Sequence, residues 1–265
     1  MNIASSLAPT LTTNLNSVQA SIVDTQNQLA TGKKNLNAAQ VGIVTRLSAQ
    51  VSGYNSVVAD IAAGTSVLNV SNTALTSISN IVSQCKDIAT QAANAGLTSG
   101  DRTALNTTYS QLMTQVTNLI NNATVNGDNI LLSTGTSPAI QTGITSASTT
   151  AITNLALNTA LATSVASTVS TAAAAGTSMD LLTTALSTIS TNQSTLSALQ
   201  VGLNAQSAAS ASLSTNLQAT VDSMQSVDST ALQAKLQALN DQQSIDYYLV
   251  SQMNTAASAA LSIFR

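Results

Sequence analysis

The sequence predicts a mainly α protein in which long antiparallel helices form a coiled-coil-like rod, the terminal helices pair, and a small irregular or β insert lies in the middle. Apolar residues in both halves of the chain recur at alternating intervals of three and four, which places them on one face of a helix. The hydrophobic residues, 44% of the chain, include one Phe and no Trp. Thin seams between helices therefore suit this composition better than a thick globular core.

The N-terminal part, residues 1–40, is predicted to be one helix followed by a loop. The helix should begin soon after Pro9, because a regularly spaced apolar stripe starts there, and Gly32 should end it. A loop is expected over residues 32–42. The stripe on this helix consists of Leu15, Val18, Ile22 and Leu29.

Residues 41–132 are predicted to form the N-terminal half of the rod. Apolar or small residues alternate at three and four positions from Val57 to Ala89, without a break over more than four heptads. A helix over residues 54–94 would be roughly 60 Å long at about 1.5 Å per residue. Cys85 falls on this stripe, which predicts a buried small hydrophobe rather than a reactive thiol.

Turn signals divide the remainder of this half. The run Thr-Ser-Gly-Asp at residues 98–101 is typical of a turn into a helix start, and a further apolar stripe follows it. Asn126-Gly127 favours a turn with positive φ and should lie beyond the end of that helix. Residues 130–132, Ile-Leu-Leu, are then predicted to begin a short strand or hairpin.

The second half of the chain returns to helical spacing after a different middle. Residues 133–180 are a Ser/Thr-rich outer insert, where short strands and turns are expected, with room for one helix. Residues 181–229 form the C-terminal half of the rod, and residues 230–265 form the C-terminal helix. The stripe on the C-terminal helix includes Leu236, Leu239, Leu249, Met253, Leu261 and Phe264.

The composition argues against several classes of function. The net charge is −3 and the seven Lys and Arg residues form no basic stripe, so nucleic acid is not an expected partner. The chain has no His, no Glu and a single Cys, so the usual chemistry for proton transfer and zinc binding is missing. We therefore expect no enzyme activity, no cofactor or metal, and no small-molecule substrate. A membrane partner is not expected either, because no apolar run of about 18 residues occurs, and the N-terminus lacks the features of a cleaved secretory signal.

The terminal stripes favour self-assembly. A helix with so thin a stripe buries too little apolar area to offset an ordering cost of about 1–2 kcal/mol per residue. The termini must therefore pair with each other, or become ordered when copies of the chain pack together. We predict a homopolymer of many copies, with an assembly interface that includes Leu15, Val18, Ile22, Leu29, Leu236, Leu239, Leu249, Met253, Leu261 and Phe264.

Several segments resemble, in the same order, those of the bacterial flagellins, which are the subunits of the flagellar filament. The similar segments cover about 210 of the 265 residues when taken with their helical context, and their shared order makes the resemblance specific. They are Gln28-Leu29-Ala30-Thr31-Gly32-Lys33-Lys34-Asn35-Leu36-Asn37-Ala38-Ala39, Ile88-Ala89-Thr90-Gln91-Ala92-Ala93-Asn94-Ala95-Gly96, Asp101-Arg102, Val125-Asn126-Gly127-Asp128-Asn129-Ile130-Leu131, and the closing Leu261-Ser262-Ile263-Phe264-Arg265.

The resemblance implies that the terminal helices line the lumen of a filament, that the long helices form the next shell, and that the middle faces outward. It also implies export through the flagellar type III apparatus to an extracellular filament, with flagellar cap, junction and export-chaperone proteins as partners. A hook-filament junction protein is the alternative, although the closing Leu-Ser-Ile-Phe-Arg favours a filament subunit. Since residues 193–216 carry no charge, amide and apolar contacts would replace the intersubunit ion pairs usual in the family.

Residues 82–88 align with the stretch that many flagellins present to an innate immune receptor. Gln84 stands where a recognising Arg is usual, and Lys86 and Asp87 belong to the same segment. The resemblance therefore implies weakened receptor recognition. It also marks residues 133–178 as candidates for O-glycosylation, the alternative being an unmodified, flexible surface.

Overall fold

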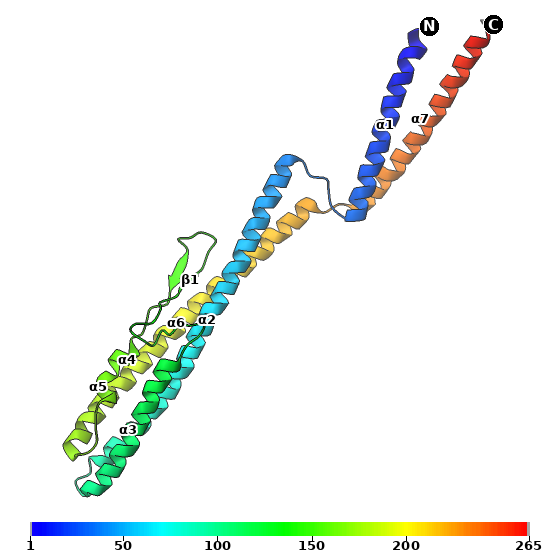
Figure 1. The fold of residues 1–265 in the computed structure, drawn as a ribbon. Coiled ribbons are helices and arrows are strands. Elements are labelled where there is room, and N and C mark those ends of the chain that lie inside the picture. The colour runs from blue at the N-terminus through cyan, green and yellow to red at the C-terminus, as the bar shows by residue number, and fades with distance from the viewer. Residues whose placement is uncertain (1, 264–265) are drawn as a thin grey trace. The chain divides into compact units, whose positions relative to one another are not determined.

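The computed structural model describes the backbone of residues 2–263 and the side chains of residues 9–259 and 262. This part of the chain is mainly helical with one small two-stranded sheet (Figure 1), which confirms the predicted fold class. It divides into two compact units. The terminal unit contains the described residues up to Ala49 and those from Asn216 onward, and the central unit contains residues 50–215.

The long helices dominate the chain. The elements in order are α1 (Asn2–Thr31), α2 (Ala38–Ala92), α3 (Ser99–Asn122), β1 (Ala139–Gln141), β2 (Thr149–Ala151), α4 (Leu157–Ala160), α5 (Ala162–Val165), α6 (Ala172–Gln225) and α7 (Ser229–Ile263). Helices α2 and α6 have 55 and 54 residues. They are far longer than an average globular helix, as the spacing predicts.

Two helix starts differ from the predictions. Helix α1 begins before Pro9 and runs through it, so the helix lacks the one backbone hydrogen bond that an N–H at position 9 would donate. The loop predicted over residues 32–42 is shorter, because α2 already starts at Ala38. A reciprocal cap sets this start: the Gln40 backbone N–H donates to Asn37 Oδ1 (2.9 Å), and the Asn37 N–H donates to Gln40 Oε1 (3.1 Å).

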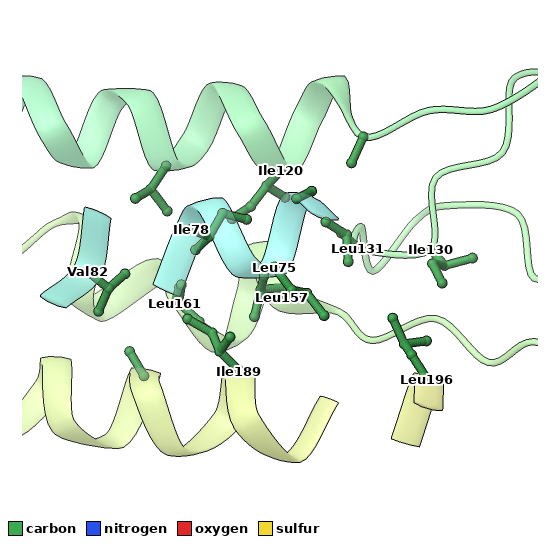
Figure 2. Packing of buried hydrophobic residues seen from close by; sticks show 14 of the residues in the cluster. Leu75, Ile78, Val82, Ile120, Ile130, Leu131, Leu157, Leu161, Ile189 and Leu196 are labelled. Carbon is green, nitrogen blue, oxygen red and sulfur yellow. The ribbon is translucent and has the colours of Figure 1, made fainter. Parts of the chain in front are cut away.

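The core of the central unit is one contiguous cluster between α2, α3, α6 and the insert. The predicted apolar stripe of α2 runs along the length of this core, and Cys85 and Ala89 on that stripe are fully buried. Figure 2 shows side chains of α2, α3 and α6 meeting those of the insert. Residues labelled there, each at most 2% exposed, are Leu75, Ile78, Val82, Ile120, Ile130, Leu131, Leu157, Leu161, Ile189 and Leu196.

A row of polar hydrogen bonds, here called the amide ladder, joins α2 to α6 in the central unit. Its members are Gln193 Nε2 to Thr76 Oγ1 (3.2 Å), Gln200 Nε2 to Asn69 Oδ1 (2.8 Å) and Ser214 Oγ to Asn55 Oδ1 (2.7 Å). Each step of seven or fourteen residues up α6 matches an equal step down α2, so the helices are antiparallel and in constant heptad register. No member of the ladder is charged. Neutral groups thus make these polar contacts within the subunit, while the replacement of intersubunit ion pairs by amides stays a prediction.

A few polar side chains hydrogen-bond to backbone groups at the start of α3 and at the end of α2. Thr98 caps α3 through a reciprocal capping box with Asp101, and these hydrogen bonds from the Thr98 side chain and backbone lower the pKa of the Asp101 carboxyl. The Arg102 guanidinium donates to the carbonyls of Ala92, Asn94 and Leu97 at 2.6–2.9 Å. It thereby satisfies carbonyls at the end of α2 and in the following loop that have no intrahelical partner.

The turn after α3 forms as predicted, but the predicted strand does not. Asn126 (φ 54°) and Gly127 (φ 91°) adopt positive φ, and the buried Asn129 amide donates to the Ile120 carbonyl at 2.8 Å. Residues 130–132 are not a strand. Ile130 and Leu131 are fully buried, and their carbonyls accept from the backbone N–H groups of residues 155 and 157, so core burial and these bonds replace the hairpin.

The hairpin of the insert lies further along the chain and rests on α2. Strands β1 and β2 pair antiparallel, with Ile140 opposite Thr150. A Cβ atom at Gly64 of α2 would lie 2.6 Å from Ile140 Cδ1. Because no side chain fits between helix and hairpin there, Gly64 allows Ile140 to be buried. The helix α6 also begins inside the predicted insert, at Ala172.

Truncating a fully buried side chain of α6 should destabilise the central unit. We expect Ile189→Ala to lower the free energy of unfolding by about 2–5 kcal/mol, because it removes transfer energy and leaves a cavity. Urea unfolding followed by circular dichroism measures this change. Val201 on the same helix is 70% exposed, and Val201→Ala should change the free energy by less than about 0.5 kcal/mol. Equal effects would contradict the burial described above.

The buried thiol on α2 should be unreactive in the folded chain. Burial raises the pKa of Cys85 to about 12, so the thiolate, which is the nucleophile, is scarce at neutral pH. We expect alkylation by iodoacetamide at pH 8 to be at least about 100-fold slower in the native chain than in guanidinium chloride. Mass spectrometry over time measures both rates, and complete labelling of the native chain within minutes would refute the expectation.

Candidate assembly interface

Helices α1 and α7 pack against each other in the terminal unit and run in opposite directions (Figure 1). The packed face of each helix follows the same three-and-four alternation as the rod, and we call this contact the terminal seam. The side chains that are buried or partly buried along it are Leu11, Leu15, Val18, Ile22, Thr25 and Leu29 on α1, and Leu232, Leu236, Leu239, Gln243, Asp246, Val250 and Met253 on α7.

Residues that line one groove together show which positions of α1 and α7 lie opposite each other. Leu11 and Met253 line this groove together. One heptad inward on each helix lie Val18 and Asp246, which are 6% and 8% exposed, and they therefore face each other across the seam. Thr25, fully buried, satisfies its own hydroxyl by donating to the Ser21 carbonyl at 2.7 Å.

Polar contacts hold the other end of the terminal unit. The Lys34 backbone N–H donates to the Gln225 carbonyl (2.7 Å), so the loop after α1 is tied to the end of α6 through its backbone. The Asp24 carboxylate accepts from the amides of Gln28 and Asn35. Asp228 caps α7 by accepting from the backbone N–H groups of residues 230 and 231. Lys34 thus acts here through its main chain.

The predicted interface residues divide into three groups. Those that enter the terminal seam are Leu15, Val18, Ile22, Leu29, Leu236, Leu239 and Met253. Leu249 does not enter it and is 44% exposed. The side chain of Leu261, and Phe264 altogether, lie outside the described part of the structure. Sequence reasoning missed Leu11, Gln243, Asp246 and Val250. A spacing of seven from Val18 and from Met253 was a usable signal for Leu11 and Asp246.

Large apolar side chains of the terminal unit are left open to solvent. The exposed fractions are 59% for Ile245, 52% for Tyr247, 63% for Tyr248 and 51% for Val23. The groove beside the terminal seam is also mainly apolar, with Leu11, Leu249, Met253 and Ala256 among its lining residues. On α7, residues 245–249 include four exposed large side chains, those of Ile245, Tyr247, Tyr248 and Leu249. Single exposed apolar residues are common on protein surfaces, but such a cluster is typical of an interaction surface.

The three residues of the predicted immune-receptor segment lie on α2 in the central unit. Gln84 and Asp87 are exposed and Lys86 is partly buried, while their neighbour Cys85 points into the core. The side of this segment that carries Gln84 and Asp87 is therefore accessible in the single chain.

This arrangement defines a class of protein: a helical structural subunit that assembles with copies of itself, in which thin helical seams carry the fold and the terminal helix pair exposes apolar side chains. A family model described as the bacterial flagellin N-terminal helical region matches residues 4–136. The chain belongs to the bacterial flagellin family, as the sequence resemblance indicates, and members of this family are the structural subunits of the flagellar filament.

Some relatives match over nearly the whole chain. The flagellins FljN and FljM of Caulobacter vibrioides are 30% and 28% identical to it, over 95% of this chain and 94% of each relative. A flagellin of Listeria innocua is 25% identical over 46% of this chain and 44% of its own. Similarity to the first two therefore includes the insert and most of both terminal helices.

Solved structures share the fold. The crystal structure of Bacillus cereus flagellin matches with a TM-score of 0.52 and 26% identity, covering 56% of this chain and 85% of that one. A flagellar hook-associated protein of Vibrio parahaemolyticus matches with a TM-score of 0.53, covering 70% of this chain and 95% of that one. At 14% identity, this second match shows the fold alone. Among the described residues, none of the helices is both long and apolar enough to cross a lipid bilayer.

Adjacent residues on α1 provide a test of the terminal seam. Ile22 is 8% exposed and Val23 is 51% exposed. We expect Ile22→Ala to destabilise the α1·α7 pair by about 2 kcal/mol or more, because a buried side chain is truncated in a two-helix contact. Hydrogen exchange of the amides in both helices measures the effect. Val23→Ala is the matched control and should leave exchange in α7 unchanged. Faster exchange confined to α1 would mean that the helices do not stabilise each other.

Proposed function

We propose that the chain polymerises with many copies of itself into the bacterial flagellar filament used for swimming, and that the terminal unit drives this polymerisation. The observation that carries the proposal is the cluster of exposed apolar side chains on α7 beside a thin seam. An isolated pair of helices gains little from such a seam, whereas a second layer of copies would bury the open side chains. Family membership supports the filament as the assembly.

The assembly interface in this proposal consists of two parts. The predicted residues Leu15, Val18, Ile22, Leu29, Leu236, Leu239 and Met253 act indirectly, since they hold α1 against α7. Leu249, with the predicted Leu261 and Phe264, contacts other copies directly. The five-part division into 1–40, 41–132, 133–180, 181–229 and 230–265 is retained as a proposed layering of the filament, with the first and last parts innermost and the insert outermost.

The proposed environment follows from the family. The filament is extracellular, subunits leave the cell through the flagellar export apparatus, and flagellar cap, junction and export-chaperone proteins are the partners outside the homopolymer. No enzymatic activity is proposed, because the chain lacks the His and Glu residues of the usual hydrolytic sites. The hook-filament junction alternative has no support in the family comparison, and copy number and polymerisation separate it from the filament role.

Weak recognition by the innate immune receptor is part of the proposal. The exposed side chain at position 84 is an amide, which cannot provide the charged, bidentate hydrogen bonds of an arginine. Gln84→Arg should therefore raise receptor signalling in a reporter-cell assay at least about tenfold, the effect of 1.4 kcal/mol. Gln193→Arg, on a different helix, is the control for a non-specific effect of added charge. No gain from the Gln84 variant would remove this part of the proposal.

Electron microscopy of the purified chain tests the proposed assembly. Seeded full-length chain should form uniform tubes roughly 100–200 Å wide, a width set by several helical layers about 10 Å apart. A chain lacking residues 1–32 and 230–265 should form none, because it has lost the terminal seam and the exposed turn of α7. Circular dichroism of the truncated chain controls for folding of the central unit. A full-length chain that stays monomeric with seeds would favour the junction role.

A further inference from the structure

The tight turn after α3 carries the one Asn-Gly pair of the sequence, Asn126-Gly127. Val125 and Asp128 on either side of it exchange two backbone hydrogen bonds of 2.9 Å each, and both central residues have positive φ, as in a two-residue hairpin turn. Asn126 and Gly127 are exposed. Within the described residues, neither the Asn126 side chain nor the Gly127 N–H makes a hydrogen bond. The two groups are therefore free to react with each other.

The other asparagines outside the described helices and strands differ from Asn126 in two respects. None of them is followed by glycine, and the side chain of each is held by at least one hydrogen bond. They are Asn35, Asn37, Asn94, Asn129 and Asn154. At Asn126 the side-chain amide is free, and the next residue has no side chain to hinder the approach of its backbone nitrogen. The combination of a free amide and a following glycine marks one position in this chain.

We propose that Asn126 is a site of spontaneous deamidation, a reaction to which asparagine is prone. The Gly127 backbone nitrogen attacks Asn126 Cγ, and the new C–N bond closes a five-membered succinimide. The side-chain amide nitrogen leaves as ammonia, which takes up the proton of the Gly127 N–H. Water then opens the ring at Cγ to give aspartate, or at the main-chain carbonyl carbon of residue 126 to give isoaspartate. Water is the one co-reactant, and no oxidant or reductant is needed.

The turn controls the rate of ring closure. The ring is nearly planar, so the bond between Cα and the carbonyl carbon of Asn126 must rotate to bring Cγ and the Gly127 nitrogen together. The two backbone hydrogen bonds between Val125 and Asp128 resist this rotation. The reaction therefore proceeds when the exposed turn opens locally, which costs far less free energy than global unfolding. Deamidation is slower in the folded chain than in the unfolded chain, but it continues in the folded protein.

The isoaspartate product acts on the end of α3 through Asn129. The buried Asn129 side chain donates to the Ile120 carbonyl (2.8 Å) and accepts from the Leu131 N–H (2.9 Å). In isoaspartate the main chain runs through Cβ and Cγ, which lengthens a two-residue turn by one methylene group. The pairing of Val125 with Asp128 and the position of Asn129 cannot then both be kept. Isoaspartate therefore loosens the end of α3, whereas aspartate adds a charge and leaves the backbone unchanged.

Mass spectrometry of the purified full-length chain tests the modification. After weeks in mildly alkaline solution, fragmentation should locate a carboxylate at position 126, and an isoaspartyl methyltransferase should label the same peptide, while Asn94 and Asn154 keep their amides. Conversion in guanidinium chloride should be at least about tenfold faster, because the hydrogen bonds of the turn are lost. Asn126→Gly keeps the positive φ and is the matched control, which should give no label at the turn. A folded chain that retains the Asn126 amide while the unfolded chain loses it would refute the proposal.

Hydrogen exchange tests the effect on α3. In chain enriched in isoaspartate, the Leu131 amide should exchange at least about tenfold faster than in fresh chain, because its hydrogen bond to Asn129 is lost. Freshly prepared Asn126→Asp controls for the added charge and should exchange like the wild-type chain. Equal exchange in enriched and fresh chain would overturn the loosening of α3. This inference goes beyond the proposed function and does not depend on it, since every measurement uses the free subunit.

Discussion

The packing of apolar side chains at alternating intervals of three and four is the interaction on which the rest of this protein depends. It lets α2 and α6, of 55 and 54 residues, bury a core with hardly any aromatic side chain. Leu75 and Ile189 illustrate it, since each belongs to a helical stripe and each is fully buried in the central unit. In the central unit the stripes also pack against a third helix and the insert, so their side chains are fully buried. In the terminal unit only two helices meet, so most side chains of the seam stay partly exposed.

The scarcity of charge shapes how polar groups are satisfied. Hydroxyls and amides take most of the roles that ion pairs have in charge-rich helical proteins, as in the amide ladder between α2 and α6. Three charged side chains act at helix ends, where backbone groups lack partners. Asp101 lies at the start of α3, Arg102 of α3 donates to the end of α2, and Asp228 precedes α7. Contacts between neutral groups respond little to salt, so the stability of the central unit should depend little on ionic strength.

The terminal and central units differ in how much their seams bury, and this difference carries the functional argument. In the central unit the α2 stripe is almost wholly enclosed, whereas most residues of the terminal seam are only partly buried. The terminal unit also keeps an unsatisfied carboxylate inside and large apolar side chains outside. The central unit thus buries its own apolar side chains, whereas the terminal unit leaves some of its apolar side chains exposed. In the proposed polymer, copies of the same chain would cover these exposed side chains.

The sequence by itself determined the mainly α class, the presence of the long helices, the turn at Asn126-Gly127 and the burial of Cys85, because heptad spacing and turn chemistry are local properties of the chain. The starts of α2 and α6, at Ala38 and Ala172, lie earlier than the spacing predicted. It also located most of the α1 and α7 seam residues. Only the tertiary structure decided that residues 130–132 enter the core instead of a strand, that Ile140 packs against Gly64, and that Asp246 faces inward while Leu249 faces out. Those outcomes depend on which surfaces meet across the fold, and a one-dimensional pattern does not contain that information.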